Sequence, residues 1–322
     1  MAHLIGTDEA GYGPNLGPLV ISATLWEVPD GVRNEDLYRL LGDVVTAQPR
    51  DAEQNGRRVP MADSKVLYQS GKGLSRLEHG LLAALALLDR RPATWRQLWE
   101  ALAPDAIGPR ESIPWYAGYE TAIPLGADGR ATEQAAAALR TGFAAAGVRL
   151  LEVRSRVVFE AEFNRLVDHY GSKGEALSQT TLALVAGVCR PLPAGQIKII
   201  CDKHGGRNRY QHLLAEHFPE RLIEVYAEGR DRSVYRFGPP ERRIEIGFHA
   251  KAESHLPAAL ASMASKYLRE LAMEALNAFW RRRVPGLQRT AGYPADARRF
   301  KADIAGAQAA LGIDDRSLWR FR

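Results

Sequence analysis

Residues 3–25 contain the pattern that decides the fold, HLIGTDEAGYGPNLGPLVISATL. The first apolar segment of this stretch is short and ends in acidic residues, which is typical of a β-strand. A turn rich in glycine and proline follows over 11–18, and 19–25 is a second apolar segment with the length of a buried strand. We therefore expect two neighbouring strands joined by a glycine turn, with Asp8 and Glu9 at the end of the first strand.

Helical and strand patterns alternate over the rest of the chain. Apolar residues at helical spacing predict helices over 74–90, 131–146, 178–188 and 254–280. Short apolar or alternating segments predict strands over 150–158, 197–201, 222–226, 233–237 and 243–248. This mixture is typical of an α/β domain. The segment near 90–130 is rich in Trp and Pro, and we interpret it as an insertion lying over the main body.

Composition narrows the class of protein. The chain has 322 residues, of which 46% are hydrophobic and 25% charged, as in ordinary globular proteins. Two cysteines exclude a disulfide framework, and no apolar run reaches the roughly 20 residues that span a bilayer. We expect a soluble, cytoplasmic protein without a membrane partner. We also expect a monomer, since the sequence has no coiled-coil pattern.

The positive charge is concentrated near the C-terminus. The formal net charge is +5, and residues 281–322 hold ten basic residues against four Asp, a local balance of 10 − 4 = +6. The other residues are therefore close to neutral. A basic segment on a neutral body is typical of polyanion binding, and the alternative is a solvated helical face with a basic tail.

Four carboxylates stand where strands end or helices begin. Asp8 and Glu9 follow one apolar strand, Asp202 follows another, and Glu253 precedes the long predicted helix. Each acid taken alone is typical of a turn or a helix cap. Together they form the oxygen-ligand set that Mg²⁺ or Mn²⁺ prefers, and such a set can hold two ions about 4 Å apart for phosphodiester hydrolysis.

Other chemistries fit the sequence poorly. The glycines at 11, 13 and 17 lack dinucleotide spacing and precede a strand, and there is no P-loop sequence. Cys and His residues do not have zinc-site spacing. We interpret His204, close to Asp202, as a turn residue, and the alternative is that it touches the site.

Five blocks, in this order, resemble the type 2 ribonucleases H (ribonuclease HII). They are Gly6–Pro14 (GTDEAGYGP) with Gly17–Val20 (GPLV), Asp63–Leu67 (DSKVL), Ile199–Asp202 (IICD), Lys251–Glu253 (KAE) with Ala261–Lys266 (ASMASK), and Gly292–Pro294 (GYP). The resemblance implies a ribonuclease H-like mixed sheet flanked by helices, with a helical C-terminal part. It also implies a divalent-metal-dependent endoribonuclease that cleaves the RNA strand of RNA–DNA hybrids or cuts at embedded ribonucleotides.

The resemblance assigns roles to particular residues. Asp8, Glu9, Asp202 and Glu253 would be the catalytic, metal-binding carboxylates, with two Mg²⁺ or Mn²⁺ ions. Gly11, Tyr12 and Gly13 would sense the ribose 2′-hydroxyl, which distinguishes RNA from DNA. Lys65 would contact a phosphate, and Tyr293 would pack against the deoxyribose of the junction.

The chain also departs from the family pattern. Tyr12 stands where the family usually has Arg, and Glu253 where it usually has Asp. We divide the chain into a catalytic domain, 1–280, with insertions near 90–130 and 228–248, and a basic substrate-binding segment, 281–322. Two alternatives remain open: a nucleic-acid-binding paralogue with weak or no catalysis, and a nuclease of the same fold with a different substrate.

Overall fold

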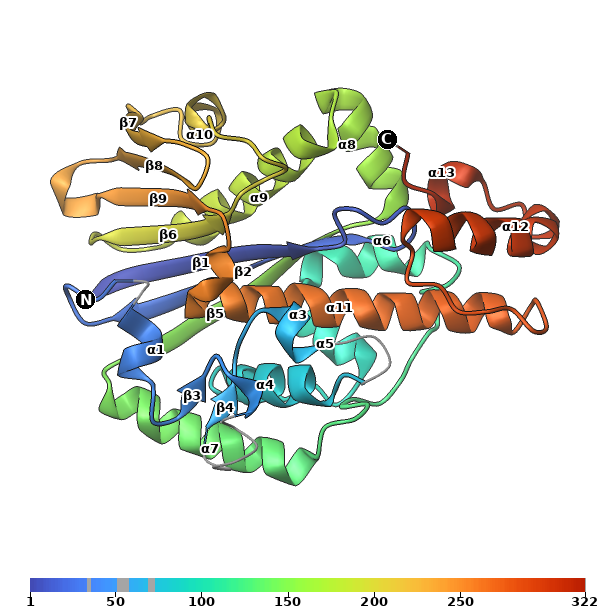
Figure 1. Cartoon of the computed structure of the whole chain (residues 1–322), viewed down its shortest axis with the longest axis horizontal. Helices are drawn as coiled ribbons and strands as arrows, with labels where there is room; N and C mark the ends of the chain where they lie inside the picture. The colour runs from blue at the N-terminus through green and yellow to red at the C-terminus, as the bar shows by residue number, and fades with distance from the viewer. Residues whose placement is uncertain (34–35, 51–57, 69–72, 322) are drawn as a thin grey trace.

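The computed structural model describes residues 1–33, 36–50, 58–68 and 73–321. Within these ranges one mixed sheet of seven strands has the order β5-β2-β1-β6-β9-β8-β7 (Figure 1). Its strands are β1 (Ala2–Ala10), β2 (Leu19–Val28), β5 (Arg149–Val158), β6 (Ile197–Asp202), β7 (Glu224–Glu228), β8 (Arg232–Phe237) and β9 (Ile244–His249). Strand β1 is antiparallel to β2 and parallel to β6, and β6 is parallel to β9. A short parallel pair, β3 (Val45–Thr46) and β4 (Val59–Pro60), lies outside this sheet.

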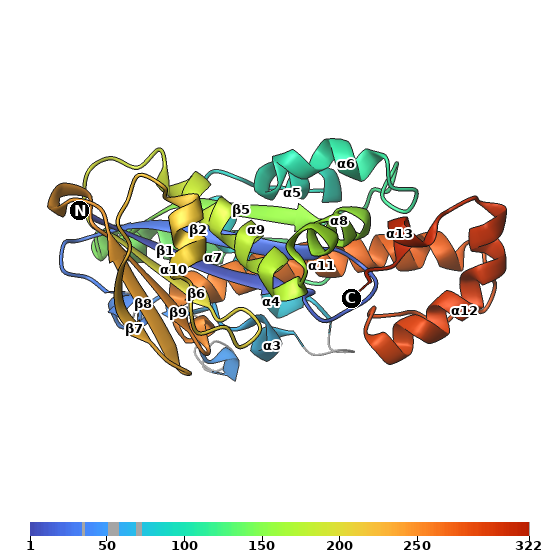
Figure 2. The ribbon, with the colours of Figure 1, turned by 90° about the horizontal axis from the view of Figure 1, so that it is seen from above.

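Helices cover the sheet. They are α1 (Leu37–Leu40), α3 (Ser64–Leu67), α4 (Ser75–Ala86), α5 (Trp95–Leu102), α6 (Ile107–Glu111), α7 (Gly129–Ala145), α8 (Glu160–Tyr170), α9 (Lys173–Cys189), α10 (Gln211–His217), α11 (Leu256–Arg281), α12 (Pro294–Ala310) and α13 (Asp315–Leu318). The largest core lies between β1, β2 and β5 on one side and α4, α5 and α11 on the other. A second core joins the opposite face of β6, β8 and β9 to α9 and α10 (Figure 2).

This architecture confirms the predicted fold class, an α/β fold with a mixed sheet flanked by helices and a helical C-terminal part. The adjacent pair predicted from the glycine turn is the antiparallel pair β1–β2. The strands predicted over 222–248 form β7, β8 and β9, of which β7 and β8 extend the sheet beyond β9. None of the helices that the structure describes has the length and apolar character needed to cross a membrane.

The Trp-rich segment near 90–130 contributes to the main core. Trp95, Trp99 and Trp115 are fully buried, and the rings of Trp95 and Trp99 lie 4.9 Å apart. Trp99 also stacks on Phe159, which directly follows β5, with ring centroids 5.9 Å apart. These aromatic side chains are therefore structural and are not available to stack on bases.

A close contact between β1 and the start of α11 fixes the helix on the sheet. A Cβ at Gly6 would lie 2.1 Å from the carbonyl carbon of Pro257 and 2.2 Å from the amide nitrogen of Ala258. On the neighbouring strand, the Thr24 hydroxyl donates to the Pro257 carbonyl at 2.7 Å. The absence of a side chain at Gly6 therefore lets the α11 backbone lie directly against the strand that ends in Asp8 and Glu9.

We expect Gly6→Ala to lower the free energy of unfolding by at least about 1–3 kcal/mol, because the backbone of β1 or of the start of α11 must move to admit the methyl group. Urea unfolding measures this change. Gly187→Ala, within α9, is the matched control: a Cβ there meets nothing within 4 Å, so stability should stay unchanged or rise. Equal stability of Gly6→Ala and the wild type would show that the close approach of α11 to β1 does not require glycine at position 6.

Candidate active site

Three of the predicted carboxylates meet at one edge of the sheet. Asp8 and Glu9 come from the end of β1, and Asp202 ends β6, the parallel neighbour of β1. Parallel strands bring their carboxyl ends to the same edge. One ligand oxygen from each of the three side chains lies within 4.8 Å of the others. The fold thus brings the side chains of the three acids together, as their positions at strand ends predicted.

The three carboxylates have perturbed acidities. Burial raises the pKa of Asp8 well above its ordinary value, and repulsion from Glu9 and Asp202 adds to this shift. Burial and repulsion from Asp202 raise the pKa of Glu9 to about 7. Burial likewise raises the pKa of Asp202. Three acids whose charges are this unfavourable together are typical of a site that accepts a cation.

Helix α11 supports Asp8 from one side. The Ser265 hydroxyl donates to the Asp8 carbonyl at 2.9 Å and lies within hydrogen-bond distance of the Ser22 hydroxyl, at 2.8 Å. A hydrogen bond from Ser262 to the Asp8 carboxylate lowers the pKa of Asp8, opposing part of the rise caused by burial. The serines of the ASMASK block therefore fix the backbone and side chain of the first acid.

Glu253 lies beside this cluster and outside its 4.8 Å limit. It belongs to a short 3₁₀ turn, Ala252–Ser254, that joins β9 to α11. Burial raises the pKa of Glu253, and repulsion from Asp202 and Asp63 raises it further. The Ala252 amide donates to Asp202 Oδ1 at 3.4 Å. The charge of the fourth acid therefore interacts with the cluster, but its carboxylate oxygens are not grouped with those of the other three acids.

Lys65 supplies a positive charge at the same edge. Asp63 caps α3 by accepting from the Lys65 amide at 3.0 Å, and the Ser262 hydroxyl bonds the Ser64 hydroxyl at 2.9 Å, which ties α3 to α11. Burial alone would lower the pKa of Lys65, but Asp63, Glu253 and the cluster acids raise it above its ordinary value. Asp63 is therefore a negative charge next to Lys65, a role that the sequence pattern did not predict.

The glycine turn next to the carboxylates has a constrained backbone. Gly11 has a φ of +92°, and a Cβ there would lie 2.5 Å from Arg269 Nε and from the Pro18 carbonyl oxygen. Gly13 is exposed, whereas Tyr12 is half-buried and packs on a small core that includes α8 and α9 residues. Burial raises the pKa of Tyr12, as does the nearby charge of Glu9. The turn therefore presents backbone at Gly13 and turns the Tyr12 ring inward.

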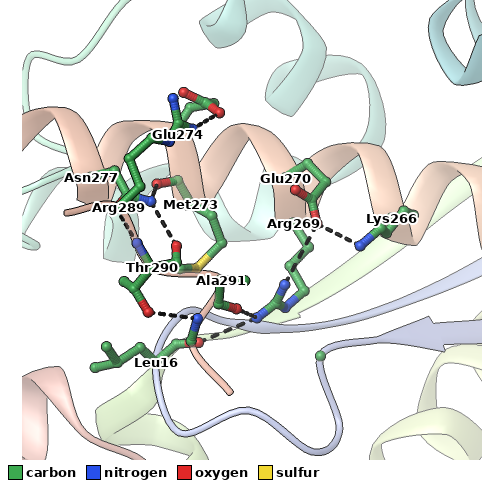
Figure 3. A network of polar contacts seen from close by, with 12 residues as sticks. Leu16, Lys266, Arg269, Glu270, Met273, Glu274, Asn277, Arg289, Thr290 and Ala291 are labelled. Carbon is green, nitrogen blue, oxygen red and sulfur yellow. Dashed lines mark hydrogen bonds and ion pairs between the residues drawn. The ribbon is translucent and has the colours of Figure 1, made fainter. Parts of the chain in front are cut away.

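A buried charged network holds this turn from behind. Arg320 donates to the carbonyls of Gly11, at 2.5 Å, and Pro14. Arg269 donates to the Leu16 carbonyl at 3.4 Å (Figure 3), and Glu160 accepts from the Gly17 amide at 3.0 Å. All three charged side chains are at most 2% exposed. Sequence patterns do not predict this network, although an arginine inside the apolar pattern over 254–280 is a signal of it.

Tyr293 is attached to the same turn. It precedes α12 and is 55% exposed. The carbonyl of Gly292 accepts from the amides of Asn15, at 2.8 Å, and Leu16, at 3.3 Å. Arg269 also donates to the Ala291 carbonyl at 3.1 Å (Figure 3). The exposed Tyr293 ring is therefore held in a fixed relation to the glycine turn.

Much of the C-terminal positive charge is neutralised within the protein. Ion pairs join Arg289 to Glu274, Arg299 to Asp296 and Asp303, Lys301 to Asp315, and Arg316 to Asp168. Arg320 is buried. Arg281, Arg282 and Arg289 line a hollow of about 660 Å³ beyond the end of α11. The local excess of +6 therefore overstates the charge that this segment presents to a polyanion.

His204 lies in the interior. Its side chain is 2% exposed, its Nδ1 lies 3.0 Å from the Ser178 hydroxyl, and burial lowers its pKa to about 3. His204 is not one of the residues grouped with Asp8, Glu9 and Asp202. These contacts agree with the interpretation of His204 as a structural residue after the strand.

No family model and no curated protein matches the chain. Its fold is similar to that of ribonucleases HII and HIII. Among solved structures, the chain is 16% identical to ribonuclease HII of Archaeoglobus fulgidus, described in complex with PCNA, over 99% of this chain and 94% of that one (TM-score 0.45). It is 16% identical to ribonuclease H2 of Pyrococcus horikoshii OT3, over 98% and 92% (TM-score 0.43). For Bst-RNase HIII in complex with Mn²⁺, the identity is 15%, over 99% and 66% (TM-score 0.41).

We expect Arg320→Met to lower the free energy of unfolding by about 1–3 kcal/mol, because the carbonyls of Gly11 and Pro14 lose a charged donor and Glu160 loses one of two nearby arginines. Without this donor, the amides of residues 11–17 should also exchange hydrogen faster. Denaturant unfolding and hydrogen exchange measure the two effects. Arg316→Ala, which removes an exposed ion pair with Asp168, should cost about 1 kcal/mol or less. Equal effects of the two substitutions would contradict the role of the network.

The raised pKa of Glu9 predicts a pH dependence of stability in metal-free protein. The folded state binds the Glu9 proton more tightly than the unfolded state, so this group favours folding below about pH 4.5. That contribution is lost as the pH rises to about 7. Thermal melts should therefore show a steeper fall in stability over this range for the wild type than for Glu9→Gln. At pH 7.5, Mn²⁺ should raise the melting temperature of the wild type more than that of Glu9→Gln. Equal pH slopes would contradict the prediction.

Proposed function

We propose that this protein is a divalent-metal-dependent endoribonuclease of the ribonuclease H type. Its substrate would be the RNA strand of RNA–DNA hybrids or an embedded ribonucleotide in a duplex. The observation that supports this most is the convergence of Asp8, Glu9 and Asp202 at one sheet edge, with ligand oxygens within 4.8 Å. Lys65 and Glu253 lie in the same electrostatic environment.

The donor set fits hard divalent cations. Asp8, Glu9 and Asp202 offer carboxylate oxygens, which suit Mg²⁺ or Mn²⁺, and Glu253, which lies outside the group of three, would be the fourth ligand. When bound, such ions would activate water and stabilise the charge on the leaving oxygen. The elevated pKa values of Asp8 and Glu9 support this, because a cation would offset both the burial and the repulsion that raise them.

Other residues would bind and orient the substrate. Lys65 would contact a phosphate next to the carboxylates, as a point charge on a flexible stem. The backbone of Gly11, Tyr12 and Gly13 would sense the ribose 2′-hydroxyl, and the exposed Tyr293 ring would pack on the neighbouring deoxyribose. Hydrolysis would leave 5′-phosphate and 3′-hydroxyl ends. The segment 281–322 would add backbone contacts through the arginines at the end of α11.

Tyr12 favours junction sensing through the main chain. Its ring is half-buried and lies against the core near α8 and α9, so the position gives no exposed cation to the turn. Sensing would therefore depend on the backbone of a turn whose carbonyls accept from Arg320 and Arg269. If the Tyr12 turn does not sense the 2′-hydroxyl, the protein would act on a different substrate or would bind without cleaving.

We expect Asp202→Asn to reduce cleavage of a hybrid duplex by at least about 100-fold in Mg²⁺ or Mn²⁺, since it removes one charge of the metal-binding set. Gel-resolved cleavage of a labelled hybrid measures the rate. Glu220→Gln changes an exposed carboxylate in the loop after α10 and should leave the rate unchanged.

A substrate panel separates the alternatives. It compares an RNA–DNA hybrid, a duplex with one ribonucleotide, double-stranded RNA and double-stranded DNA. Cleavage of only the first two supports the proposal, and cleavage of only the last two assigns another substrate. Binding of hybrid without cleavage in either metal identifies a binding paralogue.

A further inference from the structure

The hairpin β7–β8 extends the sheet beyond β9, on the side away from β1. Tyr235, Phe237 and Phe248 turn inward to the core with α9 and α10. Because strand side chains alternate, the residues between them point to the opposite face, the one on which α11 lies against β1. Figure 1 shows β7, β8 and β9 continuing the sheet to one side of the start of α11.

The strand register places this face in line with the candidate active site. Asp202 pairs with His249, and His249 pairs with Arg232. Residues paired across strands point to the same face, so these three side chains form one row across β6, β9 and β8. Neighbouring strands lie about 4.8 Å apart, which puts the Arg232 backbone roughly 10 Å from that of Asp202.

A second row lies four residues further back along the strands. It consists of Lys198 on β6, Glu245 on β9 and Arg236 on β8. Between the two rows is a hollow of about 260 Å³. Four cations and one carboxylate line this hollow: Arg33, Lys198, Arg232, Arg236 and Glu245. The face is therefore predominantly positive although it borders an acidic site.

The cations differ in how far they are neutralised. Arg236 pairs with Glu245 at 2.7 Å, and its guanidinium lies 4.0 Å from the ring centroid of Tyr226. Among the residues that the structure describes, Lys198 donates to one backbone carbonyl, that of Val32, at 3.5 Å. Arg232 is exposed and has no ion-pair partner in the part of the chain that the structure describes. The least neutralised arginine of the face is thus the one in the row of Asp202.

We propose that this face binds the phosphate backbone of the substrate duplex on one side of the cleavage point, with Arg232 as the contact closest to the carboxylates. The proposal rests on the proposed function and extends it. One strand of a duplex has a phosphate about every 3.4 Å of axial rise, so a separation of roughly 10 Å corresponds to about three nucleotides. A duplex cut at Asp202 must continue past the site, and this face provides positive charge where it would do so.

A duplex fits this face better than an acidic peptide does. Along the row, the charge changes from negative at the acidic cluster to positive at Arg232. The phosphates of a nucleic acid can bind next to the carboxylates because both can coordinate the same metal ions. A peptide carboxylate would gain attraction at Arg232 alone. Continuity with the carboxylates therefore favours the nucleic acid.

The test compares Arg232→Ala with Arg130→Ala, an exposed arginine in α7 on the other side of α11. Binding is measured with labelled RNA–DNA hybrids in Ca²⁺ over a salt series, and cleavage in Mn²⁺. The hybrids differ in the number of base pairs on each side of one fixed cleavage point. Thermal melts check that both variants fold.

We expect Arg232→Ala to weaken binding of long hybrids by roughly threefold to tenfold and to lower the salt slope by about one. The rate at saturating substrate should stay unchanged, and hybrids trimmed to two base pairs on the relevant side should bind wild type and variant equally. Arg232→Lys should restore most of the affinity, and Arg130→Ala should match the wild type.

Equal binding of long hybrids by Arg232→Ala and the wild type would overturn the proposal. So would an equal loss for long and trimmed hybrids, because the contact would then lie within the cleavage site itself. A wild type that binds hybrid without cleaving it in any metal overturns the proposed function alone, since the binding comparison still decides the role of Arg232.

Discussion

The close contact of α11 with β1 at Gly6 is the constraint on which the site depends. It brings Ser262 and Ser265 against Asp8, and through Ser262 it also positions Ser64 and the start of α3. The turn before α11 carries Glu253 to the same edge. Residues from four separate parts of the sequence are thus placed by one backbone-to-backbone contact.

Two groups of charges lie next to the glycine turn, and burial disfavours the charged forms in both groups. The carboxylates at the end of β1 and β6 are reachable from solvent, and burial and mutual repulsion make their charged forms unfavourable. Glu160, Arg269 and Arg320 are enclosed and hydrogen-bond to the turn backbone, but burial raises the pKa of Glu160 to about 7, and burial together with repulsion from Arg269 lowers the pKa of Arg320 to about 9. Hydrogen bonds to the turn backbone offset part of the cost of the second group, whereas a bound cation would offset the repulsion among the carboxylates.

The sequence was sufficient to predict most of the fold and the three converging acids. Strands over 3–8 and 197–201 end in acids, and parallel pairing brings such ends together, so Asp8, Glu9 and Asp202 could be placed without coordinates. The exact place of Glu253 could not, because it depends on how the short turn after β9 meets α11. The basic character of 281–322 was visible, but its internal ion pairs were not, since they join residues up to 148 positions apart.

Buried polar networks are the part that sequence patterns predict least well. Arg269 interrupts an apolar helix pattern, and nothing in its neighbours indicates that it meets Leu16, 253 positions earlier. Similarly, alternation predicted strands over 233–237 and 243–248, but only the observed register showed that Arg232 shares a row with Asp202. Periodicity fixes the face of a residue, whereas register between distant strands fixes its neighbours.

The contact from Arg320 to Gly11 joins residues 309 positions apart, and this has a consequence for biosynthesis. During translation, β1 and its turn leave the ribosome long before the arginine that holds the turn has been made. Until then, the carbonyls of Gly11 and Pro14 lack this donor, and Glu160 has only Arg269 of the two arginines beside it. The turn can thus gain these contacts only after residue 320 has been made, so a chain that stops earlier would lack them next to the carboxylates.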